Sequence, residues 1–223
     1  MQTFAVTAPI AAVVAVPAGS LRFIAADRAD ATVEVRPSSP AKSRDVKAAE
    51  AVDVSFADGV LRVTAPEAKN QLFGASGSVE ITVRLPAGSS VEGRAAAGEL
   101  RGVGRLGDVV FEAAQGSVKL DEAANARLTL QDGPLTIGRL TGSAELTTAR
   151  GDLTVTEAVA GTVVLDTRAG SITVGAARGT SAALDAGTAL GRVSNSLRNA
   201  AGQDAELTIR ATTALGDITA HAN

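Results

Sequence analysis

The segment GDLTVTEAVAGTVVLDTRAGSITV, residues 151–174, contains two copies of a glycine-initiated repeat that indicates the fold. Gly151 and Gly170 each begin a five-residue pattern in which the third and fifth residues are apolar and the second and fourth are variable. A glycine followed two residues later by an apolar residue recurs at intervals of 17 to 19 residues at Gly98, Gly116, Gly133, Gly151 and Gly170, and it returns at Gly191 and Gly216 after 21 and 25 residues. Near-constant spacing of this kind is typical of a solenoid, in which each repeat packs against its neighbours.

A second turn series lies between these glycines, at Gly107, Asn125, Gly142, Gly161 and Gly179. Each repeat therefore holds short strands separated by turns. Because side chains of a strand alternate between its two faces, one set of apolar residues is predicted to form inward rows: Val118, Leu120, Leu135, Ile137, Leu153, Val155, Ile172 and Val174. A third apolar position recurs at Leu140, Val159 and Ala177, so the sequence is compatible with either a two-sided or a triangular cross-section of the coil.

We therefore predict an all-β chain in which residues 91–223 form a β-solenoid, similar to a β-helix, of about 18 residues per coil. The predicted structural turn residues of this solenoid are Gly98, Gly116, Gly133, Gly151, Gly170, Gly191 and Gly216. Residues 194–204 are polar and interrupt the period, which predicts a loop that bulges from the rod or covers the final coil.

Residues 1–90 are predicted to form an N-terminal β region that is continuous with the solenoid in one folding unit. Asp58-Gly59 between two alternating runs predicts a β-hairpin, and residues 43–51 are compatible with one short helix. A polar loop is expected over residues 66–77. The sequence Pro-Ala-Gly-Ser occurs at 17–20 and again at 86–89, which favours two structurally similar strand–turn units.

Composition excludes several kinds of site. The chain is 45% apolar but 2% aromatic, so aliphatic side chains must fill a narrow core. It has no cysteine and a single histidine, His221, which excludes disulfides and thiolate chemistry and disfavours a histidine metal cluster or a Ser-His-Asp triad. A net charge of −3 argues against a nucleic-acid partner. We expect no metal and no cofactor.

Carboxylates are the residues in this sequence that could serve calcium binding or catalysis. Asp108, Asp152 and Asp217 each follow a glycine, but aspartate does not recur every nine residues as in a calcium-binding β-roll, so a turn-forming role is expected. Polysaccharide-cleaving β-helix enzymes use paired carboxylates, and the candidates are Asp108, Glu112, Glu145, Asp152, Asp166 and Asp185. Glu145 and Asp166 could be near neighbours on adjacent coils, although no aromatic platform for sugar rings accompanies them.

Threonines expected to point outward are Thr129, Thr136, Thr147, Thr154, Thr156, Thr167 and Thr173. Only Thr154-Val155-Thr156 forms the Thr-x-Thr unit of an ice-binding face, so these residues are interpreted as ordinary exposed strand positions.

The apolar stretch at residues 4–18 is not interpreted as a secretory signal, because no positive side chain precedes Phe4. A strand is predicted instead over roughly residues 10–16, ended by a turn at residues 17–20. This interpretation predicts a cytoplasmic protein, with the cell envelope or secretion as the alternative. No apolar run reaches the roughly 18–20 residues of a membrane span.

A resemblance to a known family rests on three segments, FAVTAPIAAVVAVPAGSLRF at 4–23, VRLPAGSSV at 83–91 and LGDITA at 215–220. The chain resembles a bacterial adhesin-like family of β-strand-repeat domains of unknown function. The resemblance implies a β-solenoid and a role in binding. We expect a non-catalytic structural or interaction module, that is, a scaffold for protein interaction. Its partner would be an unknown protein or envelope component, or a second copy joined edge to edge. The alternative is a carbohydrate-active β-helix enzyme acting on a polysaccharide.

Overall fold

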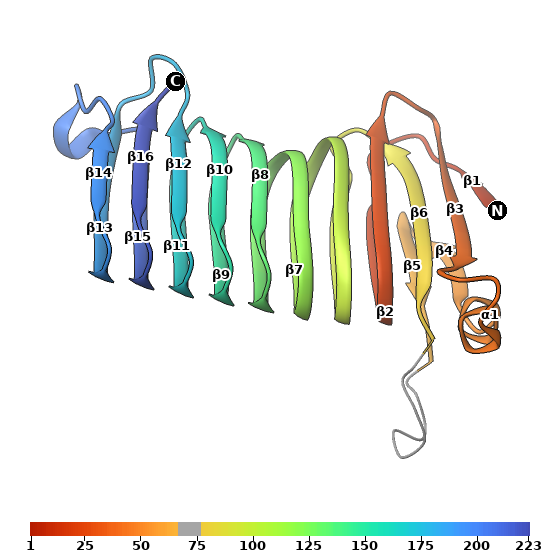
Figure 1. The fold of residues 1–223 in the computed structure, drawn as a ribbon. Coiled ribbons are helices and arrows are strands. Elements are labelled where there is room, and N and C mark those ends of the chain that lie inside the picture. The colour runs from red at the N-terminus through yellow and green to blue at the C-terminus, as the bar shows by residue number, and fades with distance from the viewer. Residues whose placement is uncertain (67–76) are drawn as a thin grey trace. The chain divides into compact units, whose positions relative to one another are not determined.

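The computed structural model describes residues 1–66 and 77–223 (Figure 1). The chain divides into two compact units, Met1–Gly116 and Ser117–Asn223. The division falls inside one long strand, β7 (Ser90–Asp132). The expected domain boundary at residue 90 therefore lies within the first unit. Most of the loop expected at 66–77 lies outside the described residues.

The first unit is built around β2. Its elements are β1 (Gln2–Ala5), β2 (Ala11–Ala26), β3 (Asp30–Pro37), α1 (Ser43–Glu50), β4 (Asp53–Ala57), β5 (Val60–Thr64), β6 (Val79–Pro86) and the first part of β7. Strand β2 pairs in parallel with β5, β6 and β7, whereas β3 is antiparallel to β1 and β6. Strands β4 and β5 form an antiparallel hairpin, in which Asp58 and Gly59 have φ values of 51° and 74°. Positive φ at both central residues is what a two-residue hairpin turn requires.

The two Pro-Ala-Gly-Ser segments have different structures, so the predicted similarity between them is wrong. Gly19 lies inside β2 opposite Gly98, and a Cβ added there would be 2.0 Å from the carbonyl oxygen of Val79. Strand β2 changes pairing partner around it, from β5 over residues 11–15 to β6 over residues 19–26. Gly88, by contrast, sits in a turn after β6, where an added Cβ would meet nothing closer than 3.8 Å.

The second unit is all parallel in its described strand pairs. Its strands after β7 are β8 (Leu135–Leu140), β9 (Ala144–Arg150), β10 (Leu153–Ala158), β11 (Gly161–Ala169), β12 (Ile172–Ala176), β13 (Ala182–Leu190), β14 (Val193–Ser196), β15 (Leu207–Leu215) and β16 (Ile218–Ala222), and a 3₁₀ turn spans Gly202–Asp204. One row of strands runs β7-β8-β10-β12-β16-β14, and the other runs β7-β9-β11-β15-β13. Each repeat supplies one strand to each row.

The register confirms the predicted inward rows. Leu153 lies opposite Leu135 on one side and Ile172 on the other, and the eight apolar residues predicted to face inward are at most 1% exposed. The outward assignment of Thr167 is wrong, because its residue is only 2% exposed. Thr167 shares the inward parity of Val163 and Leu165 along β11.

The spatial order of the last repeats differs from their order in the chain. The C-terminal strands β15 and β16 lie between β11–β12 and β13–β14, as Figure 1 shows for β12, β16 and β14. The predicted loop at 194–204 therefore begins as strand β14 and then carries the chain back toward the start of β13. There the carbonyl oxygen of Arg198 accepts a hydrogen bond of 2.9 Å from the Ala182 amide.

Candidate interaction surface

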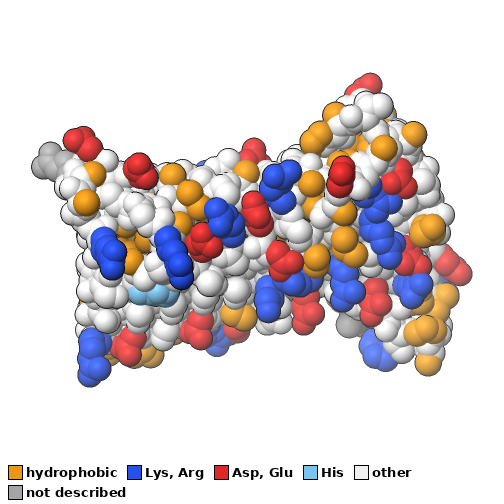
Figure 2. All heavy atoms as spheres, turned by 90° about the horizontal axis from the view of Figure 1, so that it is seen from above, with side chains coloured by type: hydrophobic (Ala, Val, Ile, Leu, Met, Phe, Trp, Pro, Cys, Tyr) orange, Lys and Arg blue, Asp and Glu red, His pale blue; other side chains and the backbone are white. Residues whose placement is uncertain are grey.

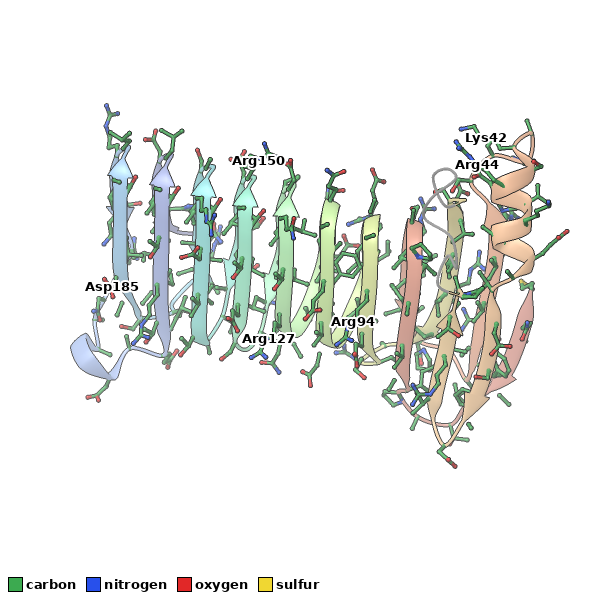
Figure 3. The ribbon with its side chains drawn as sticks, turned by 90° about the horizontal axis from the view of Figure 1, so that it is seen from below. Lys42, Arg44, Arg94, Arg127, Arg150 and Asp185 are labelled. Carbon is green, nitrogen blue, oxygen red and sulfur yellow. The ribbon has the colours of Figure 1, made fainter. Side chains whose placement is uncertain are left out.

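Strands β13 and β14 form the outermost repeat of the second unit. Each has one neighbouring strand, β15 and β16 respectively, so no strand pairs with the other side of either within the described part of the chain, where the Ala182 amide alone is covered by the Arg198 carbonyl oxygen. Asp185, labelled in Figure 3, lies on this outermost strand. We call residues 182–196 the terminal edge. A free parallel edge presents backbone N–H and C=O groups that are available for pairing with another strand.

The inner row of the terminal edge is only partly covered. Leu184 and Ala186 of β13 are partly exposed, whereas the residues opposite them in β15, Ile209 and Ala211, are 0% and 1% exposed. The same apolar row is thus buried when strands flank it on both sides and open when one side is missing. The core of the unit is accessible at the terminal edge.

Apolar side chains also gather on the outside of this end. The strand positions just before the corner glycines are, in spatial order, Asp132, Arg150, Ala169, Leu215 and Leu190. Asp132 and Arg150 form an ion pair with an N–O distance of 2.6 Å. Leu215 and Leu190 are instead 55% and 68% exposed, and nearby Val193 is 42% exposed. The column changes from charged to apolar as it approaches the terminal edge.

Sequence reasoning missed a row of inward threonines that connects the repeats. Thr148, Thr167, Thr213 and Thr188 lie in register, and their hydroxyls donate to the carbonyl oxygens of Gly133, Gly151, Gly170 and Gly216 respectively, at 3.0 to 3.3 Å. The signal was present as Thr-x-x-Gly, which occurs at 148–151, 167–170, 188–191 and 213–216.

The predicted turn glycines stack in columns. In the second unit, Gly133, Gly151, Gly170, Gly216 and Gly191 follow one another, and in the first unit Gly98 and Gly116 do the same. A Cβ added at Gly170, where φ is 157°, would lie 2.0 Å from the carbonyl oxygen of Gly151. Backbone of one repeat occupies the space that a side chain of the next would need.

The glycine–aspartate pairs of the second unit hold turns. Asp152 accepts a hydrogen bond of 2.7 Å from the Ser171 amide in the next repeat, and Asp217 accepts one of 2.8 Å from the Arg192 amide. Among residues 1–66 and 77–223, no three or more histidine, aspartate or glutamate side chains form a group that could hold a metal ion.

The acids considered for catalysis are spread over the molecule. Glu145 lies opposite Val164 and Asp166 lies opposite Thr147, so the two carboxylates share a face of adjacent strands but are displaced by a diagonal step. Glu145 is engaged by Arg127 at 3.2 Å.

The remaining acids lie elsewhere in the two units. In the first unit, Glu112 lies 3.7 Å from Arg94, whereas Asp185 lies on the terminal edge. Figure 3 shows Arg127 and Arg150 on opposite sides of the second unit, and Figure 2 shows acidic and basic side chains interspersed on one face.

The helices of the described residues include none with the length and hydropathy needed to traverse a bilayer.

Comparison with known proteins supports the fold. No curated protein matches the chain at a significant level. A crystal structure from Bacteroides fragilis NCTC 9343, described as a "putative adhesin", is 12% identical with a TM-score of 0.57, over 98% of this chain and 95% of that one. A "putative lipid binding protein" from Parabacteroides distasonis ATCC 8503 is 11% identical with a TM-score of 0.45, over 98% and 95%.

At such low identity the likeness to the Bacteroides structure concerns the fold alone. The family comparison reaches further, because the model described as Toastrack DUF4097 matches residues 13–223, which is nearly the whole chain. The chain therefore belongs to the Toastrack DUF4097 family.

Proposed function

We propose that the chain is a non-catalytic interaction module, a β-solenoid scaffold with coils of about 18 residues that associates through its terminal edge. The observation that carries the proposal is the terminal edge itself, where β13 and β14 each have a single neighbour and Leu184 is partly exposed. Strand addition to a free edge uses backbone hydrogen bonds for affinity and side-chain rows for specificity.

A second copy of the chain is the occupant that the edge fits best. Strands β13 and β14 lie on either side of Gly191 in the chain. A partner that covers the terminal edge must therefore add one strand beside each of them and also extend the apolar inner row. The terminal edge of another copy offers the same two strands and the same row. Pairing of one surface with itself gives a closed two-fold dimer. Leu190 and Val193, exposed in the single chain, would lose contact with water near such an interface.

The placement of the acids supports this role over polysaccharide cleavage. Glu145, one half of the candidate pair, is held by Arg127, and Asp166 is displaced from it by a diagonal step on the adjacent strand. The description of the Bacteroides protein as a "putative adhesin" agrees with a binding role and supports the cell envelope as the location, which was the alternative to the cytoplasm.

The proposal is tested by measuring molar mass in solution over a range of protein concentrations, by light scattering after size exclusion. The wild type should form a dimer. Leu184→Lys places a charge in the open inner row, where lysine can still reach water, and should leave a folded monomer. The matched control is Thr162→Lys, which alters an exposed residue of β11 away from the edge and should remain dimeric. A wild type that is monomeric at every concentration contradicts the proposal.

A further inference from the structure

The first unit contains a polar groove that the proposed self-association does not use. Its volume is about 370 Å³, and it lies over strands β2, β6 and β3. The charged and hydroxyl side chains that line it are Ser20, Arg22, Glu34, Arg36, Glu80, Thr82 and Arg84. Three basic and two acidic residues thus meet in one cavity.

The strand register places these side chains in rows on one face. Arg22 in β2 lies opposite Thr82 in β6, and Thr82 lies opposite Glu34 in β3. Arg84 is two residues further along β6, on the same face as Thr82 because strand side chains alternate. Arg22 and Arg84 are therefore on neighbouring strands, one diagonal step apart, on either side of a threonine hydroxyl.

The charges of the groove are unevenly balanced. Arg36 is neutralised by Glu34, with an N–O distance of 2.6 Å. Arg22 and Arg84 form no ion pair or hydrogen bond with any residue in the described ranges 1–66 and 77–223, and neither does Glu80. Two guanidinium groups that form no ion pair face the same cavity, and the Glu80 carboxylate and the hydroxyls of Ser20 and Thr82 lie beside them.

We propose that this groove binds an acidic saccharide, with the sugar carboxylate held between Arg22 and Arg84. Guanidinium groups bind carboxylates through paired, charge-assisted hydrogen bonds, which lysine cannot reproduce. Glu80 accepts hydrogen bonds from sugar hydroxyls, and Thr82 and Ser20 donate to or accept from them. Arg22 and Arg84 give the site its preference for an anion, whereas Glu80 disfavours densely charged ions such as free phosphate.

The test is isothermal titration calorimetry of the full chain with a uronic-acid oligosaccharide, oligogalacturonate, at low ionic strength. The wild type should bind with an affinity that decreases as salt is added, because the contact is a charge pair near water. Arg22→Gln and Arg84→Gln should each weaken binding about tenfold or more, in line with the value of a hydrogen bond to a charged group. Neither residue is fully buried, so both variants should fold.

The matched control is Arg62→Gln, an exposed arginine of β5 that lies outside the groove and should leave binding unchanged. Neutral maltohexaose and inorganic phosphate should bind much more weakly than oligogalacturonate. Equal binding of maltohexaose or phosphate, equal loss in the Arg62 variant, or no binding of oligogalacturonate by the wild type would overturn the proposal. Leu184→Lys should retain oligogalacturonate binding, which keeps failure of the groove distinct from failure of self-association.

Discussion

Thr167 in β11 donates a hydrogen bond of 3.1 Å from its hydroxyl to the carbonyl oxygen of Gly151 in the neighbouring repeat. The donor is 2% exposed and the acceptor lies at a corner where the chain passes from one row of strands to the other. The same contact recurs in register at Thr213 and Gly170. A buried hydroxyl thus links one repeat to the next at a corner where the glycines have no side chains to pack.

Replacing Thr167 with valine should lower the free energy of unfolding by about 1–2 kcal/mol, because the partly buried Gly151 carbonyl loses its donor. Urea unfolding followed by circular dichroism measures the change. The matched control is Thr162→Val in the same strand, where the side chain is exposed and the expected change is within about 0.5 kcal/mol. Equal effects of the two substitutions would contradict a structural role for the hydrogen bond.

Replacing Gly170 with alanine should be more costly. The new Cβ would lie 2.0 Å from the Gly151 carbonyl oxygen, at a φ of 157° that side chains rarely adopt, so the repeats must separate locally. We expect a loss of at least about 2 kcal/mol in unfolding free energy. Gly187→Ala is the comparison, since an added Cβ there meets nothing within 4 Å. That variant should be neutral or gain up to about 1 kcal/mol, and its chemical denaturation midpoint should not decrease.

The exposed leucines at the terminal edge should contribute to association and not to folding. Replacing both Leu190 and Leu215 with serine should weaken dimerisation at least about tenfold, a change of about 1.4 kcal/mol, with little change in melting temperature. Sedimentation velocity measures the former and thermal unfolding the latter. Val110→Ser, which alters an exposed apolar residue of the first unit, should leave the dimer intact. A dimer unaffected by the double substitution would place the interface elsewhere.

The ion pair between Arg139 and Glu157 should add little stability, although its N–O distance is 2.7 Å. Both side chains are substantially exposed, at 46% and 33%, so water and salt screen the attraction. A double-mutant cycle with Arg139→Gln and Glu157→Gln should give a coupling of about 0.2–1 kcal/mol. Repeating the unfolding measurements in 1 M NaCl should remove most of that coupling, where the Debye length is about 3 Å. A coupling that is larger and independent of salt would mean that the pair is effectively buried.

Much of the second unit could be predicted from the sequence because its rules are local. Leu153 and Val155 are inward because they alternate with threonine after a glycine, and the near-constant spacing places the next repeat's Ile172 and Val174 beside them. Thr167 was assigned outward because threonine suits exposed strand positions, although the alternation through Val163 and Leu165 places it inward. At this position the alternation along the strand outweighs the preference of threonine for exposed sites.

The candidate surfaces were less predictable. Arg22 and Arg84 are 62 residues apart in the chain and meet only because β2 and β6 pair in parallel. The two Pro-Ala-Gly-Ser segments show the same limit. Gly19 lies inside a continuous strand against the backbone of Val79, whereas Gly88 sits in an open turn, and only their neighbours in space distinguish them.

The glycine period, the inward apolar rows and an aliphatic core almost without aromatic rings all follow from the amino-acid order, because alternation along a strand is set by neighbouring residues in the chain. The order in which the repeats stack depends on contacts between residues far apart in the chain. Gly191 follows Gly170 in sequence, yet Gly216 lies between them in space. Every repeat presents a similar parallel edge and a similar apolar row, so local pattern allows either order. Only the return of residues 197–206 toward the start of β13 leaves β13 and β14 as the terminal edge.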